Sequence, residues 1–436
     1  MILAQPSAHD PIRPSRRAAL PAERIRLALL WLTGASGAIV FVEPSPYEFF
    51  SFLAIVVFAA GGLALRLQLV PPAVLLALIN VGYSLSASTL LGENGVLMWI
   101  LTSWYLAVTA LFFAAIVAEN GQARLAALAR GCLIGGVIAS LVAIVGYFRI
   151  FPSANELLLL YDRARGTFKD PNVLGAFLIF PALLALQRAI TGRFREALGG
   201  MLLMALFGAA ILLSFSRAAW GEVVFASLIV LILTFVTTHS PAQRLRIVLF
   251  AAAGAALIVA FIAALLSIDV VAQLFKERAS LSQSYDVGER GRFARHALGA
   301  LLALDVPLGI GPLQFSKYFP EDPHNSYLNA FMSGGWLAGA SYLSLVLLTL
   351  VYGLKAALLR TPLQPMAIVV YAGYASVATE SAIIDSDHWR HAFMLLGLQW
   401  GLIAATRELV RGGNTAVAAA GRAPSSPALA CRAGPA

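Results

Sequence analysis

Apolar segments long enough to cross a lipid bilayer follow one another along most of this chain of 436 residues. Only 12% of its residues are charged, whereas a soluble protein carries roughly a quarter. Because lipid offers backbone groups no water to bind, runs of about 20 apolar residues indicate transmembrane helices. We therefore predict an all-α polytopic membrane protein with about 12 transmembrane helices, near residues 25–42, 48–65, 69–90, 96–118, 128–149, 171–187, 197–213, 219–236, 247–267, 325–352, 363–383 and 392–408.

The connections between these segments predict which side of the membrane each part occupies. Residues 1–24 are polar and basic and lack a signal-peptide core, so we expect a cytoplasmic tail before a retained first helix. The transmembrane domain is expected over residues 25–408, with a long and partly helical outer loop at about 268–324, before the tenth helix. Residues 409–436, rich in Ala, Gly, Pro and Ser, are expected to form a disordered cytoplasmic tail.

The net charge of +9 is explained by this arrangement. Most of it lies in cytoplasmic connections, where Lys and Arg face anionic membrane lipids. We therefore expect membrane lipids as partners and no nucleic acid.

Some basic residues nevertheless fall on the predicted outer side, against the usual bias. Arg217 lies in a short turn between two apolar stretches, beside the hydroxyl groups of Ser214 and Ser216. A guanidinium there either reaches the lipid headgroups or pairs with an anion in a water-filled cavity. Its planar fork of donors matches two phosphate oxygens. Other outer cations are Arg163, Arg165, Lys169, Lys276, Arg278, Arg290, Arg292, Arg295 and Lys317. A lipid-linked phosphate is the simplest ligand for them.

Two Asp-Pro motifs are predicted to begin membrane helices on the outer side: Asp170-Pro171-Asn172 and Asp322-Pro323-His324-Asn325. Asp suits the N-cap, and Pro at the first helical position loses no needed donor. Helix starting alone would explain Asp and Pro, but capping does not require His324. An imidazole titrates near neutrality and can take a proton from a hydroxyl nucleophile, although a single interfacial His is more often structural.

The segment 288–296 contains Arg290, Arg292 and Arg295 before an amphipathic stretch. A helix lying on the membrane surface is the simpler interpretation, and His296 is then a surface residue. The alternative is that Arg290 or Arg292 faces a substrate phosphate, and spacing does not choose between them. A second polar cluster in the last outer loop contains Asp385, Asp387, His388 and Arg390. Solvated loop residues are the simpler interpretation, and a role on the acceptor side is the alternative.

No nucleotide-binding loop, serine-hydrolase motif, zinc-protease motif or paired-cysteine motif occurs in the sequence. We therefore expect neither a cytoplasmic ATP-driven machine nor a bound cofactor. The predicted outer loops also lack an Asp-x-Asp motif, which favours chemistry without a divalent metal ion.

Taken together, these motifs resemble the O-antigen ligase and polysaccharide polymerase superfamily of bacterial inner-membrane glycosyltransferases. The resemblance covers about residues 150–350. It rests on Arg165-Gly166-Thr167-Phe168 with Pro171-Asn172, Ser214-Phe215-Ser216-Arg217, Gly309-Ile310-Gly311 with Phe315, and His324-Asn325-Ser326-Tyr327-Leu328 before Gly334-Gly335.

The resemblance implies metal-independent transfer of a glycan from undecaprenyl diphosphate to an acceptor hydroxyl at the periplasmic face. The acceptor would be lipid A-core, a growing polysaccharide or another hydroxyl. It implies that Arg217 and either Arg290 or Arg292 grip the diphosphate and that His324 orients or deprotonates the acceptor. Arg165, Ser216 and Asn325 would be further substrate-binding residues.

A transporter or flippase of lipid-linked anionic saccharide is the alternative, because it also needs outward arginines. Transporters are often built from inverted repeats, and no convincing internal repeat is found in this sequence. A purely structural membrane scaffold would give no account of Arg217 and His324.

Overall fold

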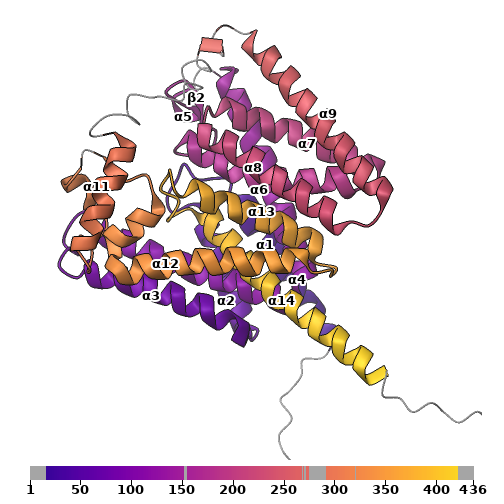
Figure 1. Cartoon of the computed structure of the whole chain (residues 1–436), viewed down its shortest axis with the longest axis horizontal. Helices are drawn as coiled ribbons and strands as arrows, with labels where there is room; N and C mark the ends of the chain where they lie inside the picture. Colours follow the sequence, from indigo (N-terminus) through magenta and orange to yellow (C-terminus); the bar gives the residue numbers. More distant parts are fainter. Residues whose placement is uncertain are drawn as a thin grey trace, which may run out of the picture.

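The computed structural model describes residues 16–151, 155–267, 269, 272–273, 291–319 and 321–420, so Arg290 lies outside the described residues. The described chain is almost entirely helical (Figure 1). Its helices are α1 (Arg16–Ser36), α2 (Pro46–Ala60), α3 (Val70–Ser86), α4 (Val96–Tyr147), α5 (Asn155–Leu158), α6 (Pro171–Thr191), α7 (Phe194–Leu213), α8 (Arg217–Thr237), α9 (Pro241–Leu266), α11 (Arg292–Asp305), α12 (Ser326–Leu358), α13 (Gln364–Glu380) and α14 (Arg390–Ala420). Two short strands, β1 (Leu159–Leu160) and β2 (Arg163–Ala164), pair antiparallel.

Eight described helices are long and apolar enough to cross a membrane: α3, α4, α6, α7, α8, α9, α12 and α14. The predicted all-α, multi-pass membrane architecture is therefore confirmed. The count of about 12 spans remains a prediction, because α1, α2 and α13 pack in the same bundle but are not among those eight.

The first and last helices extend beyond residues 25–408, the limits predicted for the transmembrane domain, and those limits remain a prediction. Helix α1 begins at Arg16, inside the predicted tail, and α14 continues to Ala420, beyond the boundary predicted at residue 408. Residues 416–420 read Ala-Val-Ala-Ala-Ala, and alanine has the highest helix propensity of all residues.

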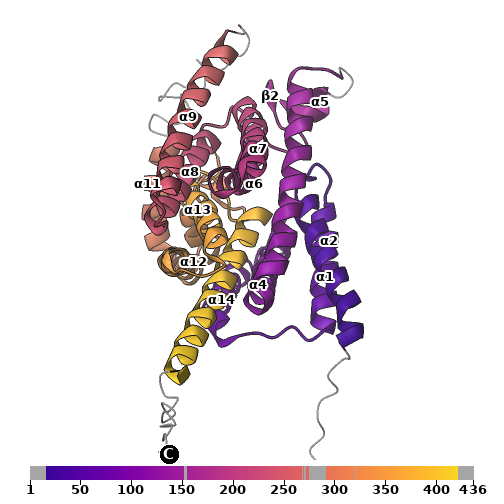
Figure 2. The ribbon, with the colours of Figure 1, turned by 90° about the vertical axis from the view of Figure 1, so that its right-hand side faces the viewer.

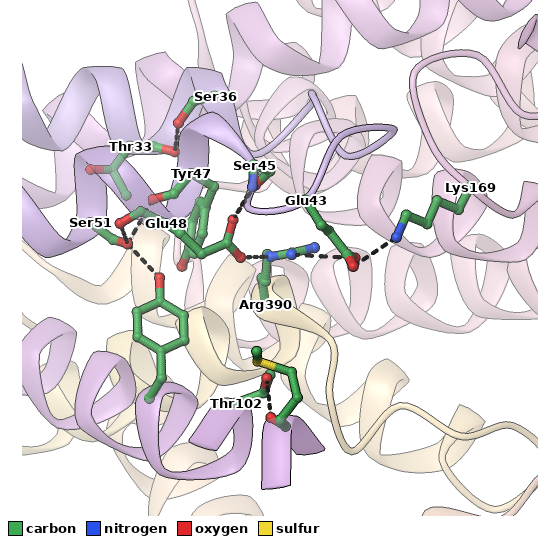
Figure 3. A network of polar contacts seen from close by, with 12 residues as sticks. Thr33, Ser36, Glu43, Ser45, Tyr47, Glu48, Ser51, Thr102, Lys169 and Arg390 are labelled. Atoms are coloured by element: carbon green, nitrogen blue, oxygen red, sulfur yellow. Dashed lines mark hydrogen bonds and ion pairs between the residues drawn. The ribbon is translucent and has the colours of Figure 1, made fainter. Parts of the chain in front are cut away.

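A polar network at one end of the bundle joins three segments that are far apart in the sequence (Figure 3). Arg390, the first residue of α14, binds Glu48 in α2 and Glu43 in the preceding loop. Glu43 also forms an ion pair of 2.8 Å with Lys169, just before α6. We call these four residues the Glu43 network. It fixes the starts of α2, α6 and α14 relative to one another.

Helix α4 is a hairpin of two helices that turns at Asn120, where the backbone is not helical (φ −142°, ψ 69°). Trp99, in its first half, lies beside His388, two residues from the Glu43 network. Ala143, in its second half, packs against Gly166, three residues from the same network. Both free ends of the hairpin therefore lie at one end of the bundle, and α4 supplies two antiparallel helices between α1 and α14 (Figure 2). This agrees with the separate spans predicted at 96–118 and 128–149.

The opposite end of the bundle carries its own ion pairs. Arg124, just after the Asn120 turn, is buried and binds Glu23 in α1 and Glu119. Arg66 binds Glu408, near the end of the membrane-spanning part of α14. Residue 23 of α1 and residue 408 of α14 thus lie at the same end of the bundle. This is the arrangement expected of a chain that crosses the membrane an even number of times.

Helix α12 is broken at Gly334 and Gly335, and a loop supplies the backbone partners that the break removes. Gly335 has a positive φ of 68°. The amide of Ile310 donates to the carbonyl of Met332 over 2.7 Å, and the amide of Trp336 donates to the carbonyl of Pro307 over 2.9 Å. The segment 306–311 therefore restores hydrogen bonds that a continuous helix would have made within itself.

Replacing Gly335 with alanine is expected to destabilise the fold by about 1–3 kcal/mol. The added methyl group would overlap the carbonyl of Pro307 and would sit on a left-handed backbone. Gly208→Ala is the matched control, because Gly208 lies in α7 with open space around its Cβ position. Thermal unfolding in detergent should show a lower Tm for Gly335→Ala and an unchanged or higher Tm for the control. Equal Tm values would refute strain at the break.

Candidate functional site

A cavity of about 730 Å³ opens among α8, α11, α13 and the loops beside them. Its volume is within the range of small-molecule sites, about 300–1,000 Å³. Two smaller cavities elsewhere have volumes of only about 60 and 40 Å³. The large cavity brings together Arg217, Arg292 and His324, three residues that the sequence singled out.

Arg217 reaches the cavity from the first position of α8. Ser216 is the N-cap, and its hydroxyl accepts a hydrogen bond of 3.3 Å from the amide of Ala219. Phe215 has a positive φ of 48°, which reverses the chain sharply between α7 and α8. Arg217 therefore lies at a helix N-terminus, where the helix dipole also favours an anion. Ser216 itself is buried and shapes this turn; it does not line the cavity.

Arg163, on β2, is the arginine of the 150–170 loop that lines the cavity. Its side chain is only 8% exposed. Its Nε donates to the carbonyl of Ser214 over 2.8 Å, and its Nη2 donates to Oδ1 of Asn172 over 2.7 Å. Arg163 thereby ties the start of α6 to the turn that presents Arg217.

The structure does not bring Arg165 to the cavity, contrary to the expectation from the sequence. Its guanidinium donates to the carbonyls of Glu156 and Leu157 over 2.6 and 3.1 Å, at the exposed surface of the loop. Gly166, which follows with a positive φ of 54°, packs against α4. Arg165 therefore closes the loop through backbone contacts.

Arg163→Ala is expected to destabilise the protein by about 1–3 kcal/mol, because the buried carbonyl of Ser214 and the half-buried Oδ1 of Asn172 would lose a charged donor. Arg165→Ala is the matched control from the same loop. Its carbonyl partners are reached by water, so the expected change is within about 0.5 kcal/mol. Thermal unfolding of both variants would measure the difference. A larger effect of Arg165→Ala would contradict these roles.

Arg292 enters the cavity from the first position of α11. Its Nη1 donates to the carbonyl of Ile383, in the turn after α13, over 3.4 Å. Helix α11 exposes Leu298, Leu301 and Leu304, as expected for the amphipathic helix predicted here.

Two contacts hold α11 against the segment that carries His324. Arg295 is buried and pairs with Glu321 over 2.7 Å. His296, interpreted from sequence as a surface residue, is half-buried, and its Nε2 donates to the carbonyl of Pro323 over 2.6 Å. Burial lowers the pKa of His296, which favours its neutral form. These contacts fix the position of α11, and with it Arg292, relative to His324.

His324 faces the cavity and is held by a carboxylate from another loop. Its Nδ1 lies 3.2 Å from Oδ2 of Asp385. The other oxygen of Asp385 accepts the amide of Asn325 over 3.0 Å. His324 has a positive φ of 47°, an uncommon conformation for a residue other than glycine. Asp385 was interpreted from sequence as a solvated loop residue, and its role appears only when the two loops are placed together.

The predicted start of α12 at Asp322 and Pro323 is wrong. The N-cap is Asn325, whose Oδ1 accepts the amide of Leu328 over 3.0 Å, and the helix begins at Ser326. The left-handed backbone of His324 interrupts any helix that would begin earlier. Burial and the nearby Asp385 raise the pKa of Asp322, which lies beside this loop. Asn325 therefore caps the helix and is not among the cavity-lining residues.

The first Asp-Pro motif behaves as predicted, since Asp170 caps α6.

The cavity is also lined by polar residues of α8 and α13 that were not predicted from the sequence. Glu222 of α8 and Glu380 of α13 are 4% and 5% exposed. The hydroxyl of Ser376 donates to Oε1 of Glu222 over 2.9 Å. Carboxyl groups within apolar helices are rare and usually functional, and this signal could have identified them from the sequence. Across the described ranges, no group of three or more His, Cys, Asp or Glu residues could hold a metal ion.

Comparison with known proteins agrees with the motifs in this cavity. Residues 202–343 match the family model described as O-Antigen ligase. The matched segment includes Arg217, Arg292 and His324, and it ends before Glu380 and Asp385. No curated protein matches the chain.

Proposed function

We propose, from the support that residues 202–343 give to the O-antigen ligase superfamily, that this chain is a glycosyltransferase. It transfers a glycan from undecaprenyl diphosphate to an acceptor hydroxyl, without a metal ion. The observation that carries the proposal is that Arg217, Arg292 and His324 line one cavity although they come from three separate segments. Such a site combines cations for a diphosphate with a base for a hydroxyl.

On the donor side, Arg217 and Arg292 bind the diphosphate. Both stand at helix N-termini, so free backbone amides and the helix dipole add to the guanidinium charge. As the bond between the anomeric carbon and the phosphate oxygen breaks, negative charge grows on the departing undecaprenyl diphosphate. Prepositioned donors stabilise that charge more strongly in the transition state than in the bound donor.

On the acceptor side, His324 takes the proton of the attacking hydroxyl. When its Nδ1–H donates to Asp385, the lone pair on Nε2 is available as a base. The hydroxyl oxygen then bonds to the anomeric carbon, and the electron pair of the broken bond leaves with the diphosphate. The carboxylate of Asp385 stabilises the imidazolium that forms.

We place the protein in the bacterial inner membrane with this cavity facing the periplasm. The support is the charge bias of the predicted loops and the position of the site. Asp385, which holds His324, precedes Arg390 of the Glu43 network by five residues, whereas the Arg124 ion pairs lie at the other end of the bundle.

Glycan analysis of a deletion strain would test the proposal and identify the acceptor. Single repeat units on lipid A-core would indicate a polymerase, and bare core with accumulated lipid-linked polymer would indicate a ligase. Loss of a secreted polymer with unchanged lipopolysaccharide would indicate an exopolysaccharide enzyme. Purified protein should form the new glycosidic bond without ATP or an ion gradient; movement of the saccharide without a new bond would contradict the proposal.

A further inference from the structure

The hydroxyl group of Ser326, the first residue of α12, binds the backbone on both sides of Asp385. It donates to the carbonyl of Ile384 over 3.1 Å and accepts the amide of Ser386 over 2.7 Å. These two groups belong to the peptide bonds immediately before and after Asp385. One side chain therefore fixes the backbone of the residue that holds His324.

This hydroxyl belongs to a group of three buried serines that joins the end of α13 to the start of α12. Ser326, Ser381 and Ser386 are 0%, 1% and 2% exposed. The hydroxyl of Ser381 donates to the carbonyl of Val377 over 2.7 Å, so its oxygen accepts the hydroxyl of Ser386. The hydroxyl of Ser326 then donates to the carbonyl of Ile384. Each of the three hydroxyl groups thereby has an acceptor, as buried polar groups require.

The contact between His324 and Asp385 is itself partly open to water. Their side chains are 40% and 27% exposed. Water competes for an exposed charged pair, and both side chains lose freedom when they pair, so such a contact does little to hold its own geometry. The buried hydrogen bonds of Ser326 are protected from this competition. The position of Asp385 relative to His324 therefore depends mainly on Ser326.

Contacts that do not involve this hydroxyl also join the two segments. The amide of Ser326 donates to the carbonyl of Ser381 over 2.8 Å. Nδ2 of Asn329 donates to Oδ2 of Asp387 over 2.8 Å. Helix α12 and the end of α13 would thus stay together if the hydroxyl were removed, and the change would be confined to the segment 384–386.

We infer that Ser326 is a positioning residue for the acceptor step. Its hydroxyl holds Asp385 where the carboxylate keeps the imidazole of His324 oriented, so that Nε2 can take the proton of the acceptor hydroxyl. Ser326 is fully buried and acts only through Asp385. The inference rests on the proposed function, because it assumes that His324 is the base.

Transfer kinetics of Ser326→Ala test this role. The measurement uses the full-length protein in proteoliposomes with undecaprenyl-diphosphate-linked glycan as donor. We expect kcat to fall about tenfold, because a slightly displaced base is far less effective. The KM for the donor should stay native, since the arginines that hold the diphosphate are unchanged. Ser341→Ala, at another buried serine of α12, is the matched control and should keep the native kcat.

The double variant Ser326→Ala/Asp385→Asn decides whether Ser326 acts through Asp385. Two residues that serve one contact have effects that do not add, so the double variant should stay within about twofold of Asp385→Asn alone. A further tenfold loss would indicate a general structural role and would overturn the inference. A native kcat for Ser326→Ala, or a loss that appears in KM, would overturn it as well.

Ser326→Cys is a second variant in case Ser326→Ala does not fold. It keeps a polar side chain of similar size, but a thiol is a weak donor and a weak acceptor. We expect a severalfold lower kcat with an unchanged KM, and a native kcat in the folded variant would contradict the inference. If the native protein itself formed no glycosidic bond, that result would instead reject the proposed function.

Discussion

Arg217→Ala is expected to lower the rate of glycan transfer by at least about 100-fold, as the loss of one well-placed donor to a developing anion commonly does. The substitution leaves the Ser216 cap and the α7–α8 turn unchanged, so folding should be preserved. The measurement is transfer from purified undecaprenyl-diphosphate-linked glycan by protein in proteoliposomes. Arg149→Ala removes an exposed ion pair with Asp162 and should retain native activity.

The variant Arg217→Lys separates shape from charge at the same position. Lysine keeps the positive charge but cannot place two parallel donors on two phosphate oxygens. We expect its rate to remain at least about tenfold below native. Near-native transfer by Arg217→Lys would show that charge alone is sufficient, and near-native transfer by Arg217→Ala would remove Arg217 from the mechanism.

His324→Ala is expected to lower the transfer rate by about 10²–10⁴-fold, the usual contribution of a general base. The affinity for the donor should change little, because the diphosphate is held by the arginines. Single-turnover kinetics together with donor binding would separate the two effects. An unchanged rate, or a parallel loss of donor affinity, would contradict the assignment of His324 to the acceptor hydroxyl.

The partner of His324 offers a more conservative test of the same step. Asp385→Asn keeps the size of the side chain but removes the charge that stabilises the imidazolium. The rate should fall by at least about tenfold. Asp305→Asn, at the exposed end of α11, is the control. Equal rates for the two variants would exclude a role for the Asp385 contact.

The parts of this site that were predicted from sequence are those with a local signal. Arg217 is conspicuous because it interrupts an apolar region within a very short turn, and the structure places it at the edge of the cavity. The helix over residues 292–305 follows from its amphipathic spacing. Hydropathy likewise separated the two halves of α4, although no proline marks the turn at Asn120.

The remaining parts depend on contacts between distant segments. Arg163 and Arg165 are two residues apart, and only the pairing of β1 with β2 and the turn at Gly166 decide which of them reaches the cavity. Asp385 is 61 residues from His324, so their contact has no local sequence pattern. Glu222 and Glu380 were not recognised from the sequence for a different reason. Hydropathy averaged over a whole span changes little when the span contains a single charged residue.

The turn after α13 has a consequence for how substitutions combine. Its residue Ile383 accepts a hydrogen bond from Arg292, and its residue Asp385 holds His324. The cation that binds the leaving group and the base that activates the nucleophile thus share one support, the segment 383–385. Energetic effects in such a shared unit are not additive. A displacement of this turn would therefore impair diphosphate binding by Arg292 and proton removal by His324 at the same time. The donor would then stay inactive whenever the acceptor cannot be deprotonated.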